Sequence, residues 1–242
     1  MKILAIESSG MPASVALLDG EILTAEYTLC YRKTHSQTLL PMLDEICRMT
    51  ETDLGSVDAI AVSSGPGSFT GLRIGSASAK GLALGLDKPI VSVPTLEGMA
   101  YNYCGSPYLI CPMLDARRSQ VFTGIYTFET RFCVLQDMEA VDAAAVAQQL
   151  NALAAETGKT VVLLGDGTAA CRNILEETLE APHLYAPAHL NAQRAGSVAM
   201  RALELFREGK TETAASHRPE YLRVSQAERV RAEKLRAAAA AE

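Results

Sequence analysis

The stretch from Ser63 to Gly85, SSGPGSFTGLRIGSASAKGLALG, constrains the fold more than any other part of the sequence. It begins at the end of an apolar run, Val57 to Ser63, and its glycine-rich turn leads into a segment with helical periodicity from Thr70 to Leu86. A buried strand, a tight turn and a helix form the basic unit of α/β proteins. We therefore predict an α/β fold built around this unit.

Similar elements flank this unit on both sides. The first half is predicted to contain strands over residues 2–7, 13–18 and 21–29, a helix over 39–49 and a strand over 90–93. The second half repeats this order loosely, with strands over 108–114, 121–128, 133–135 and 160–164 and helices over 141–153, 169–179 and 191–208. The pattern predicts two α/β lobes, each with an antiparallel start and a parallel continuation: residues 1–104, residues 105–224, and an exposed helical or disordered tail over 225–242.

Composition narrows the classes of function. The net charge of −6 argues against a protein whose whole surface binds nucleic acid. The six cysteines show neither a CxxC pair nor a zinc-ligand spacing, so we expect reduced thiols, no metal and no cofactor. No segment approaches the ~18 apolar residues of a membrane span. We expect a cytoplasmic protein without a membrane partner.

The glycine-rich stretch fails both familiar tests for a nucleotide loop. A Walker loop requires GxxxxGK[ST], but Leu72-Arg73 stands where the lysine and hydroxyl are needed. A dinucleotide fingerprint requires GxGxxG, and after Gly65 and Gly67 the next glycine, Gly71, comes one residue late. The stretch therefore indicates close packing of backbones more than binding of phosphate.

Small residues recur along one side of the predicted helix. Gly71, Gly75, Ala79 and Ala83 are spaced by four, whereas Gly81 and Gly85 lie on another face. Each helical glycine costs about 1 kcal/mol relative to alanine, so something must approach this helix closely. Two alternatives stay open: the protein's own sheet or neighbouring helix, and a helix of another protein.

Several segments together resemble the TsaB family, subunits of the bacterial machinery that makes threonylcarbamoyladenosine in tRNA. The resemblance is dense over the first 130 residues or so and thin over the rest. It is carried by ILAIESS, THSQTLLPMLDEI, AVSSGPGSFTGLRIGSASAKGLA, PIVSVPTLEGMA and MLDARRSQVFTGIY, with PEYLR near the end. The resemblance implies an ASKHA-type fold, the two-lobed architecture shared by actin, sugar kinases and the catalytic paralogue TsaD.

The resemblance also bears on whether this chain is an enzyme. In the paralogue, the segment equivalent to Val93–Met99 looks like VNHxxGH, whose two histidines hold the active-site metal, whereas this chain reads VPTLEGM. Thr95 and Met99 therefore occupy the two ligand positions, and neither replaces imidazole well. The histidines of the chain are dispersed and do not suggest a rebuilt site; they are His35, His183, His189 and His217. The resemblance implies a subunit that is not catalytic by itself.

A vestigial nucleotide site is a further implication of the fold family. Asp115 begins the DARRSQV hairpin, and Gly165 and Gly167 keep a later glycine turn that holds adenosine in ASKHA proteins. The first hairpin, ESSGMPAS, supplies no acidic residue after its turn. Autonomous ATP hydrolysis is therefore not expected, although an ASKHA-type ATPase or phosphotransferase remains the alternative function. A peptidase is a third idea, but no Ser/His/Asp triad can be inferred from Ser63, Ser64 or Ser68.

The family supplies the expected partners. The resemblance implies a heterodimer with a TsaD-type catalytic subunit, cooperation with a TsaE-type ATPase, contact with tRNA through the complex, and a homodimer when the partner is absent. In the family, two helices of each subunit meet in a four-helix arrangement. The residues implied for that contact are Leu39, Leu40, Leu43, Ile46, Cys47, Gly71, Leu72, Gly75, Ala79 and Ala83.

Overall fold

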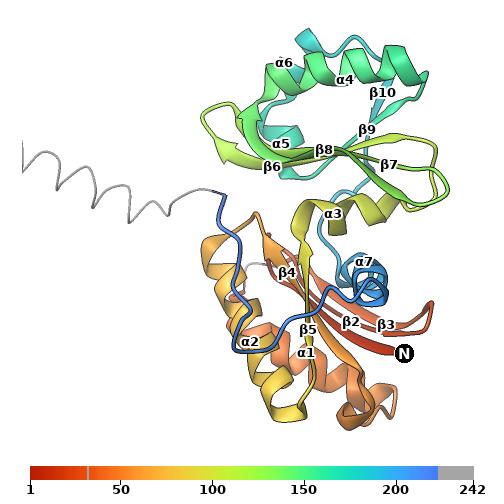
Figure 1. Cartoon of the computed structure of the whole chain (residues 1–242). Coiled ribbons are helices and arrows are strands. Elements are labelled where there is room, and N and C mark those ends of the chain that lie inside the picture. Colours follow the sequence, from red (N-terminus) through yellow and green to blue (C-terminus); the bar gives the residue numbers. More distant parts are fainter. Residues whose placement is uncertain (32, 223–242) are drawn as a thin grey trace, which may run out of the picture.

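The computed structural model describes residues 1–31 and 33–222 and shows two lobes, one above the other (Figure 1). Each lobe is built around a five-stranded sheet. The first sheet has the order β3-β2-β1-β4-β5, formed by β1 (Lys2–Glu7), β2 (Ala13–Asp19), β3 (Ile22–Leu29), β4 (Ala59–Gly65) and β5 (Ile90–Pro94). The second has the order β10-β9-β6-β7-β8, formed by β6 (Leu109–Arg117), β7 (Gln120–Phe128), β8 (Phe132–Asp142), β9 (Val161–Leu164) and β10 (His183–Tyr185).

The two sheets repeat one strand pattern. In the first, β1, β2 and β3 are antiparallel neighbours, and β4 and β5 continue from β1 in parallel. In the second, β6, β7 and β8 are antiparallel, and β9 and β10 continue from β6 in parallel. This confirms the predicted α/β fold with two similar lobes. The short strand β10 was not among the predicted elements.

Helices cover both faces of the first sheet. α1 (His35–Met49), preceded in the chain by β3, and α2 (Phe69–Leu86), preceded by β4, pack on one face, where Leu39, Ile46 and Ala79 join the core. α7 (Ala195–Arg207) packs on the opposite face through Val198 and Ala202 (Figure 1). Strand β1 lies between these layers, so its apolar side chains are fully buried on both faces.

The second sheet has its own helical cover. α4 (Ala143–Thr157) and the short helices α5 (Asp166–Ala170) and α6 (Arg172–Thr178) pack against it around Val146, Leu150 and Leu175. One further short 3₁₀ turn, Leu54–Ser56, precedes β4 in the first lobe. Among the residues that the structure describes, no helix is long and apolar enough to cross a bilayer.

A third core joins the two lobes. Helix α3 (Thr95–Ala100) and the 3₁₀ turn Tyr101–Tyr103 place Leu96 and Met99 against Tyr126 and Leu164 of the second sheet. The buried Arg201 of α7 strengthens the junction, since it forms an ion pair with Glu97 at 2.7 Å and lies 4.7 Å from the ring centroid of Phe132. The lobes are therefore joined by apolar packing and by a buried charge pair.

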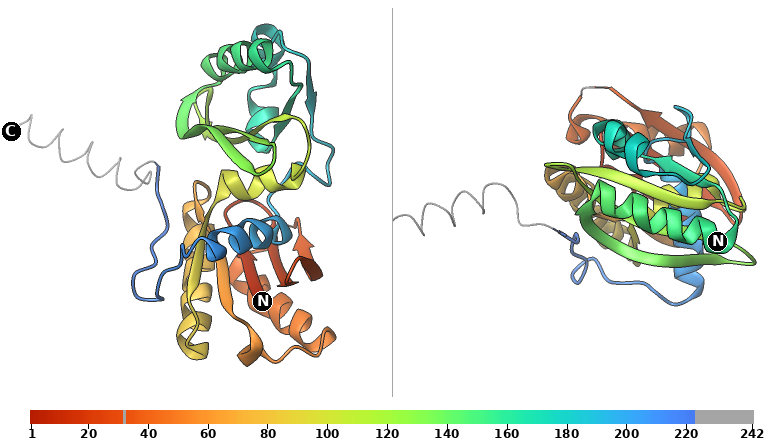
Figure 2. Two further views of the ribbon diagram at one scale, coloured as in Figure 1. Left: turned by 45° about the vertical axis from the view of Figure 1, so that its right-hand side comes forward. Right: turned by 90° about the horizontal axis from the view of Figure 1, so that it is seen from above.

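The C-terminal part of the chain returns to the first lobe. Helix α7 packs on the first sheet, and residues 211–222 then run along the same lobe (Figure 2). Glu212 forms a two-way backbone bridge with Ile90, and Glu220 donates its N–H to the carbonyl of Ser64 at 2.7 Å. The predicted second lobe of 105–224 is therefore wrong beyond about residue 194, because apolar side chains of α7 complete the first core. The predicted tail over 225–242 lies outside the described residues.

Candidate functional site

The glycine-rich turn between β4 and α2 packs on the carboxyl end of β1. Ser68 donates its N–H to the carbonyl of Ser9 at 2.6 Å, and the Ser8 hydroxyl donates to the carbonyl of Gly71 at 2.8 Å. A Cβ on Gly67 or Gly71 would lie less than 3.0 Å from a carbonyl oxygen of β1's extension, a separation that real Cβ atoms do not show. The glycines of this turn therefore allow close approach of the chain to itself.

The small-residue stripe predicted to receive a partner's helix faces inward instead. Gly71, Gly75, Ala79 and Ala83 are all buried. A Cβ on Gly75 would collide with the Ser8 hydroxyl and would touch Val62 of β4. This corrects the assignment of these four residues to a partner contact: they form the inner face of α2, and their small size lets the helix lie close on its own sheet.

Most of the larger residues assigned to the partner contact are buried as well. Leu39, Leu43 and Ile46 of α1 and Leu72 of α2 are each at most 4% exposed, because they fill the core under the two helices. Those four assignments are corrected in the same way. Of the predicted contact residues only Leu40, 51% exposed, and the half-buried Cys47 reach the surface.

The opposite face of α2, which carries Gly81 and Gly85, points outward. Arg73, Ala77, Gly81, Leu84 and Gly85 form the outer face of α2, and all five are exposed. Leu84 is 79% exposed, and a Cβ on Gly81 or Gly85 would meet nothing within 4 Å. Sequence periodicity predicted that the two sets of glycines lie on different faces of the helix, but it did not predict which face is buried. Because a large apolar side chain lies among residues with little or no side chain, this face is the better candidate for a contact between helices.

Thr95 and Met99, the two positions predicted to correspond to the paralogue's metal ligands, lie in the core between the lobes. Thr95 and Met99 are each 1% exposed on α3. The Met99 methyl group lies 3.1 Å from where a Cβ on Gly165 would be, and the Thr95 hydroxyl has no hydrogen-bond partner among the described residues. No cluster of three or more His, Cys, Asp or Glu side chains suited to a metal occurs in the part of the chain that the structure describes.

The residues predicted for a vestigial nucleotide site do lie near one another. Asp115 donates its N–H to the Asp166 carboxylate at 3.0 Å, and Asp166 stands between Gly165 and Gly167. A Cβ on either glycine, however, would lie less than 3.0 Å from the Met113 backbone. The predicted glycine turn is the start of α5, and its glycines let α5 approach β6 closely.

Glu7 is a buried acidic residue that was not among the predicted site residues. It ends β1 and is 1% exposed, and its carboxylate accepts hydrogen bonds from the Ser9 N–H, the Ser9 hydroxyl and the Ser63 hydroxyl. Burial raises the pKa of Glu7, and the hydrogen bonds from Ser63 and Ser9 oppose part of that rise. An acidic residue closing an apolar strand, followed by two serines, was the available signal.

A Ser/His/Glu cluster lies where the C-terminal segment meets β5. The hydroxyl of Ser92 lies 2.8 Å from Nδ1 of His217, and that same nitrogen lies 2.9 Å from a carboxylate oxygen of Glu212. His217 is fully buried, and its Nε2 has no partner among the described residues. A catalytic triad requires the hydroxyl and the carboxylate on different ring nitrogens. This cluster therefore fastens the C-terminal segment and does not have the geometry of a hydrolase.

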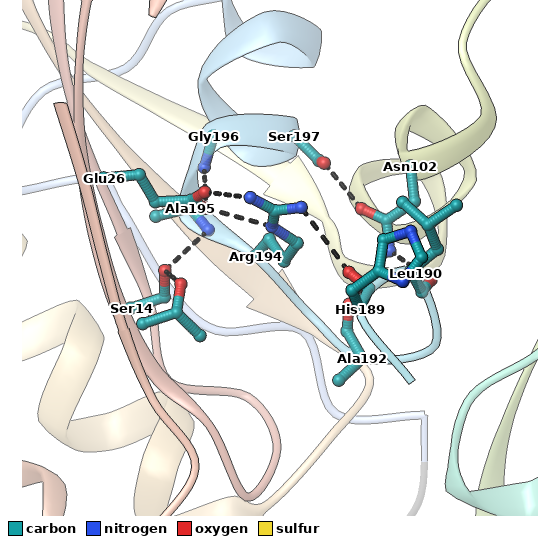
Figure 3. Close-up of polar contacts among 11 residues, drawn as sticks. Ser14, Glu26, Asn102, His189, Leu190, Ala192, Arg194, Ala195, Gly196 and Ser197 are labelled. Carbon is teal, nitrogen blue, oxygen red and sulfur yellow. Dashed lines mark hydrogen bonds and ion pairs between the residues drawn. The ribbon is translucent and has the colours of Figure 1, made fainter. Parts of the chain in front are cut away.

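A polar network holds the segment that crosses from the second lobe back to α7 (Figure 3). The Asn102 amide donates to the carbonyls of Leu190 and Ala192 at 2.8 and 2.9 Å. The Glu26 carboxylate of β3 pairs with Arg194 and accepts the N–H of Gly196 at 2.9 Å, so it also caps α7. Because the polar groups of Asn102, Glu26 and Arg194 bond to residues within this network, we interpret it as a structural connection between the lobes.

The two lobes, each with an antiparallel start and a parallel continuation, define the ASKHA class of fold. A solved hexokinase of the ROK type from Thermus thermophilus aligns with a TM-score of 0.50 over 86% of this chain and 100% of its own, at 14% identity, which shows the fold alone. A Pseudomonas aeruginosa protein described as similar to peptidase YEAZ aligns with a TM-score of 0.78 at 27% identity, over 92% of this chain and 99% of its own.

Sequence comparisons identify the family. The family model "TsaD: tRNA N6-adenosine threonylcarbamoyltransferase" matches residues 29–230. The "tRNA threonylcarbamoyladenosine biosynthesis protein TsaB" of Bacillus subtilis is 34% identical over 94% of this chain and 96% of its own, and that of Escherichia coli is 33% identical over 92% and 95%. The chain belongs to the TsaB family, within the wider group that the TsaD model describes.

Proposed function

We propose that this chain is a non-catalytic subunit in the formation of threonylcarbamoyladenosine at position 37 of tRNAs that read codons beginning with adenine. It acts with a TsaD-type catalytic subunit, which it binds as a heterodimer, and with a TsaE-type ATPase. The tRNA is reached through the assembled complex. The proposal rests on membership of the TsaB family, whose curated relatives carry this pathway in their names.

The observation that carries the non-catalytic role is the packing of Thr95 and Met99. Both side chains are committed to the core between the lobes, where Met99 contacts the cluster around Leu164. The positions at which the paralogue presents two imidazoles are thus used here to hold the lobes together. The space beside Gly71 and Gly165 is likewise occupied by the chain's own backbone. These contacts support a structural role for the region.

The outer face of α2 is the proposed contact with the catalytic subunit. Leu84 supplies an apolar anchor, and Ala77, Gly81 and Gly85 leave room for the partner's backbone to approach. Leu40 of the neighbouring helix α1 is a second exposed apolar side chain in this lobe. When the partner is absent, the same surface on a second copy is the proposed homodimer contact, since a two-fold interface uses one patch twice.

The cytoplasm is the proposed location. Cys30 and Cys104 are free and exposed, and exposed free thiols are typical of a reducing compartment. The substrate of the proposed pathway, tRNA, is found there.

The test is reconstitution with and without this protein. tRNA is incubated with the TsaD-type and TsaE-type proteins, the enzyme that makes threonylcarbamoyl-adenylate, ATP, threonine and bicarbonate, and nucleosides are then analysed by mass spectrometry. The proposal expects threonylcarbamoyladenosine only when this chain is present. Equal product without it would overturn the proposal. Calorimetry with ATP and magnesium would then test the alternative of an autonomous ATPase or phosphotransferase.

A further inference from the structure

The turn between β6 and β7 has an unusual backbone for its sequence. Arg117 pairs with Gln120, which leaves Arg118 and Ser119 as a two-residue loop. The φ angles of Arg117, Arg118 and Ser119 are 67°, 58° and 59°. Two-residue loops with positive φ at both positions are type I′ turns, which strongly prefer Asn-Gly, Asp-Gly or Gly-Gly. This chain instead places arginine and serine in the left-handed region.

The backbone of the turn is held in place, since the Ser119 carbonyl accepts the Ala143 N–H at 3.1 Å, but that bond would form with any side chain at positions 118 and 119. Arg117, Arg118 and Ser119 are all exposed, and the side chain of Arg117 is 86% exposed. Residues with a Cβ are unfavourable in the left-handed region, and asparagine or glycine would form the same turn with less strain. Backbone strain held at a surface site suggests that the side chains presented there have a use.

The charges of the two arginines are balanced differently. Asp115 accepts the Arg117 N–H at 2.7 Å and pairs with its guanidinium at 3.1 Å. Arg118 makes no hydrogen bond or ion pair with any residue from 1–31 or 33–222. Asp115 thus directs Arg117 and offsets its charge, and Arg118 stays available. On a chain with a net charge of −6, the result is a local cationic point at the tip of a hairpin.

We propose that this turn binds a phosphate group of the tRNA backbone, with Arg118 as the donor and Arg117 beside it. A guanidinium offers a planar pair of N–H groups that matches two phosphate oxygens, and phosphate contacts position a protein on a nucleic acid. The turn projects from the upper lobe at the left of Figure 1, away from the joint between the lobes. The inference rests on the proposed function, because it assumes that tRNA is bound by the complex.

The first experiment measures tRNA binding by the assembled complex. An in vitro transcribed tRNA with adenosine at position 37 is titrated, by fluorescence anisotropy, with complexes carrying wild-type chain, Arg118→Ala or Arg131→Ala. Arg131 is the matched control, an exposed arginine at the β7–β8 turn. Arg118→Ala should raise Kd about tenfold, which is the loss of one charge-assisted contact. It should also lower the slope of log Kd against log salt by about one.

A second variant separates recognition from folding. Arg118→Asn combined with Ser119→Gly gives the turn its preferred residues, so Tm should rise by about 2–4 °C while tRNA binding falls as in Arg118→Ala. Arg118→Lys should keep most of the salt dependence. Unchanged Kd and salt slope in Arg118→Ala would overturn the inference, and so would weaker assembly of the protein subunits without tRNA, since the turn would then contact protein.

The same preparations distinguish this inference from the proposed function. If leaving out the chain abolishes formation of threonylcarbamoyladenosine while Arg118→Ala binds tRNA like wild type, the proposed function stands and the phosphate contact is wrong. If leaving out the chain does not change the formation of threonylcarbamoyladenosine, the proposed function is wrong. The phosphate contact is then overturned as well, because it assumes that the complex with this chain binds tRNA.

Discussion

Helix α2 carries two stripes of small residues that look alike in sequence and differ in use. The inner face, Gly71, Gly75, Ala79 and Ala83, lies on the sheet so closely that a Cβ at its glycines would collide with Ser8. The outer face has Gly81 and Gly85 with open space around them and Leu84 79% exposed between them. Small residues in a helix therefore do not by themselves indicate a close neighbour, and burial is needed to show where one lies.

The largest expected effect comes from filling the inner face. Gly75→Leu places a branched side chain against the Ser8 hydroxyl and Val62, in a core where β1 cannot move aside. Such overpacking should lower the free energy of unfolding by about 3 kcal/mol or more. Urea unfolding followed by circular dichroism measures the change. A variant as stable as wild type would show that the helix can shift off the sheet.

Filling the outer face should leave the fold intact and affect the partner. The new side chain in Gly81→Leu points into open space, so the urea midpoint of unfolding should not change. The affinity for the TsaD-type subunit should fall about 100-fold, or ~2.7 kcal/mol. Calorimetric titration measures the affinity. Ala155→Leu on the exposed side of α4 is the matched control and should bind normally. Unchanged affinity in Gly81→Leu would remove the outer face from the proposed interface.

Alanine substitutions at Gly75 and Gly81 should change the free energy of unfolding by smaller amounts and in opposite directions. Gly81→Ala should stabilise the chain by about 1 kcal/mol, because alanine restricts the unfolded chain and favours helix. Gly75→Ala should destabilise it, since even one methyl group meets the Ser8 hydroxyl. Thermal unfolding of both variants side by side tests the pair. If both variants were stabilised, the difference between the two faces would be smaller than the structure indicates.

The smallest expected effect concerns the charge beneath the inner face. Because the pKa of Glu7 is raised in the folded chain, its carboxyl contributes stability that is full below the unfolded pKa near 4.5 and is lost as pH rises through the folded pKa. Glu7→Gln removes that loss, since its amide can still accept from Ser9 and donate to Ser63.

Urea midpoints at a series of pH values above 4.5 measure the difference, with Glu156→Gln on α4 as an exposed control. The stability of wild type should decline with rising pH relative to Glu7→Gln. Parallel curves for the two proteins would contradict a raised pKa at Glu7.

Local pattern determined much of the architecture. Alternation and apolar runs located β1, β2 and β3 and the unit from β4 to α2, whose helix begins at Phe69, one residue before the prediction. These features depend on contacts between near neighbours in the chain. The family followed from short segments, and the comparisons confirmed it. Helix α1 begins at His35, four residues before the prediction, which puts Pro41 in its second turn.

Long-range placement required the tertiary structure. Periodicity gives the angle between the two faces of α2 but not the direction of the sheet, so the residues predicted for a partner contact include several that are buried against the sheet. No local sequence pattern indicates that α7 packs on β1, which lies about 190 residues earlier in the chain. Nor does one indicate that the N–H of Glu220 donates to the carbonyl of Ser64. The sequence by itself determined most of the elements, the two-lobed architecture and the family. The tertiary structure alone decided which small residues and charges are buried and which are exposed, because burial depends on what the rest of the chain brings alongside.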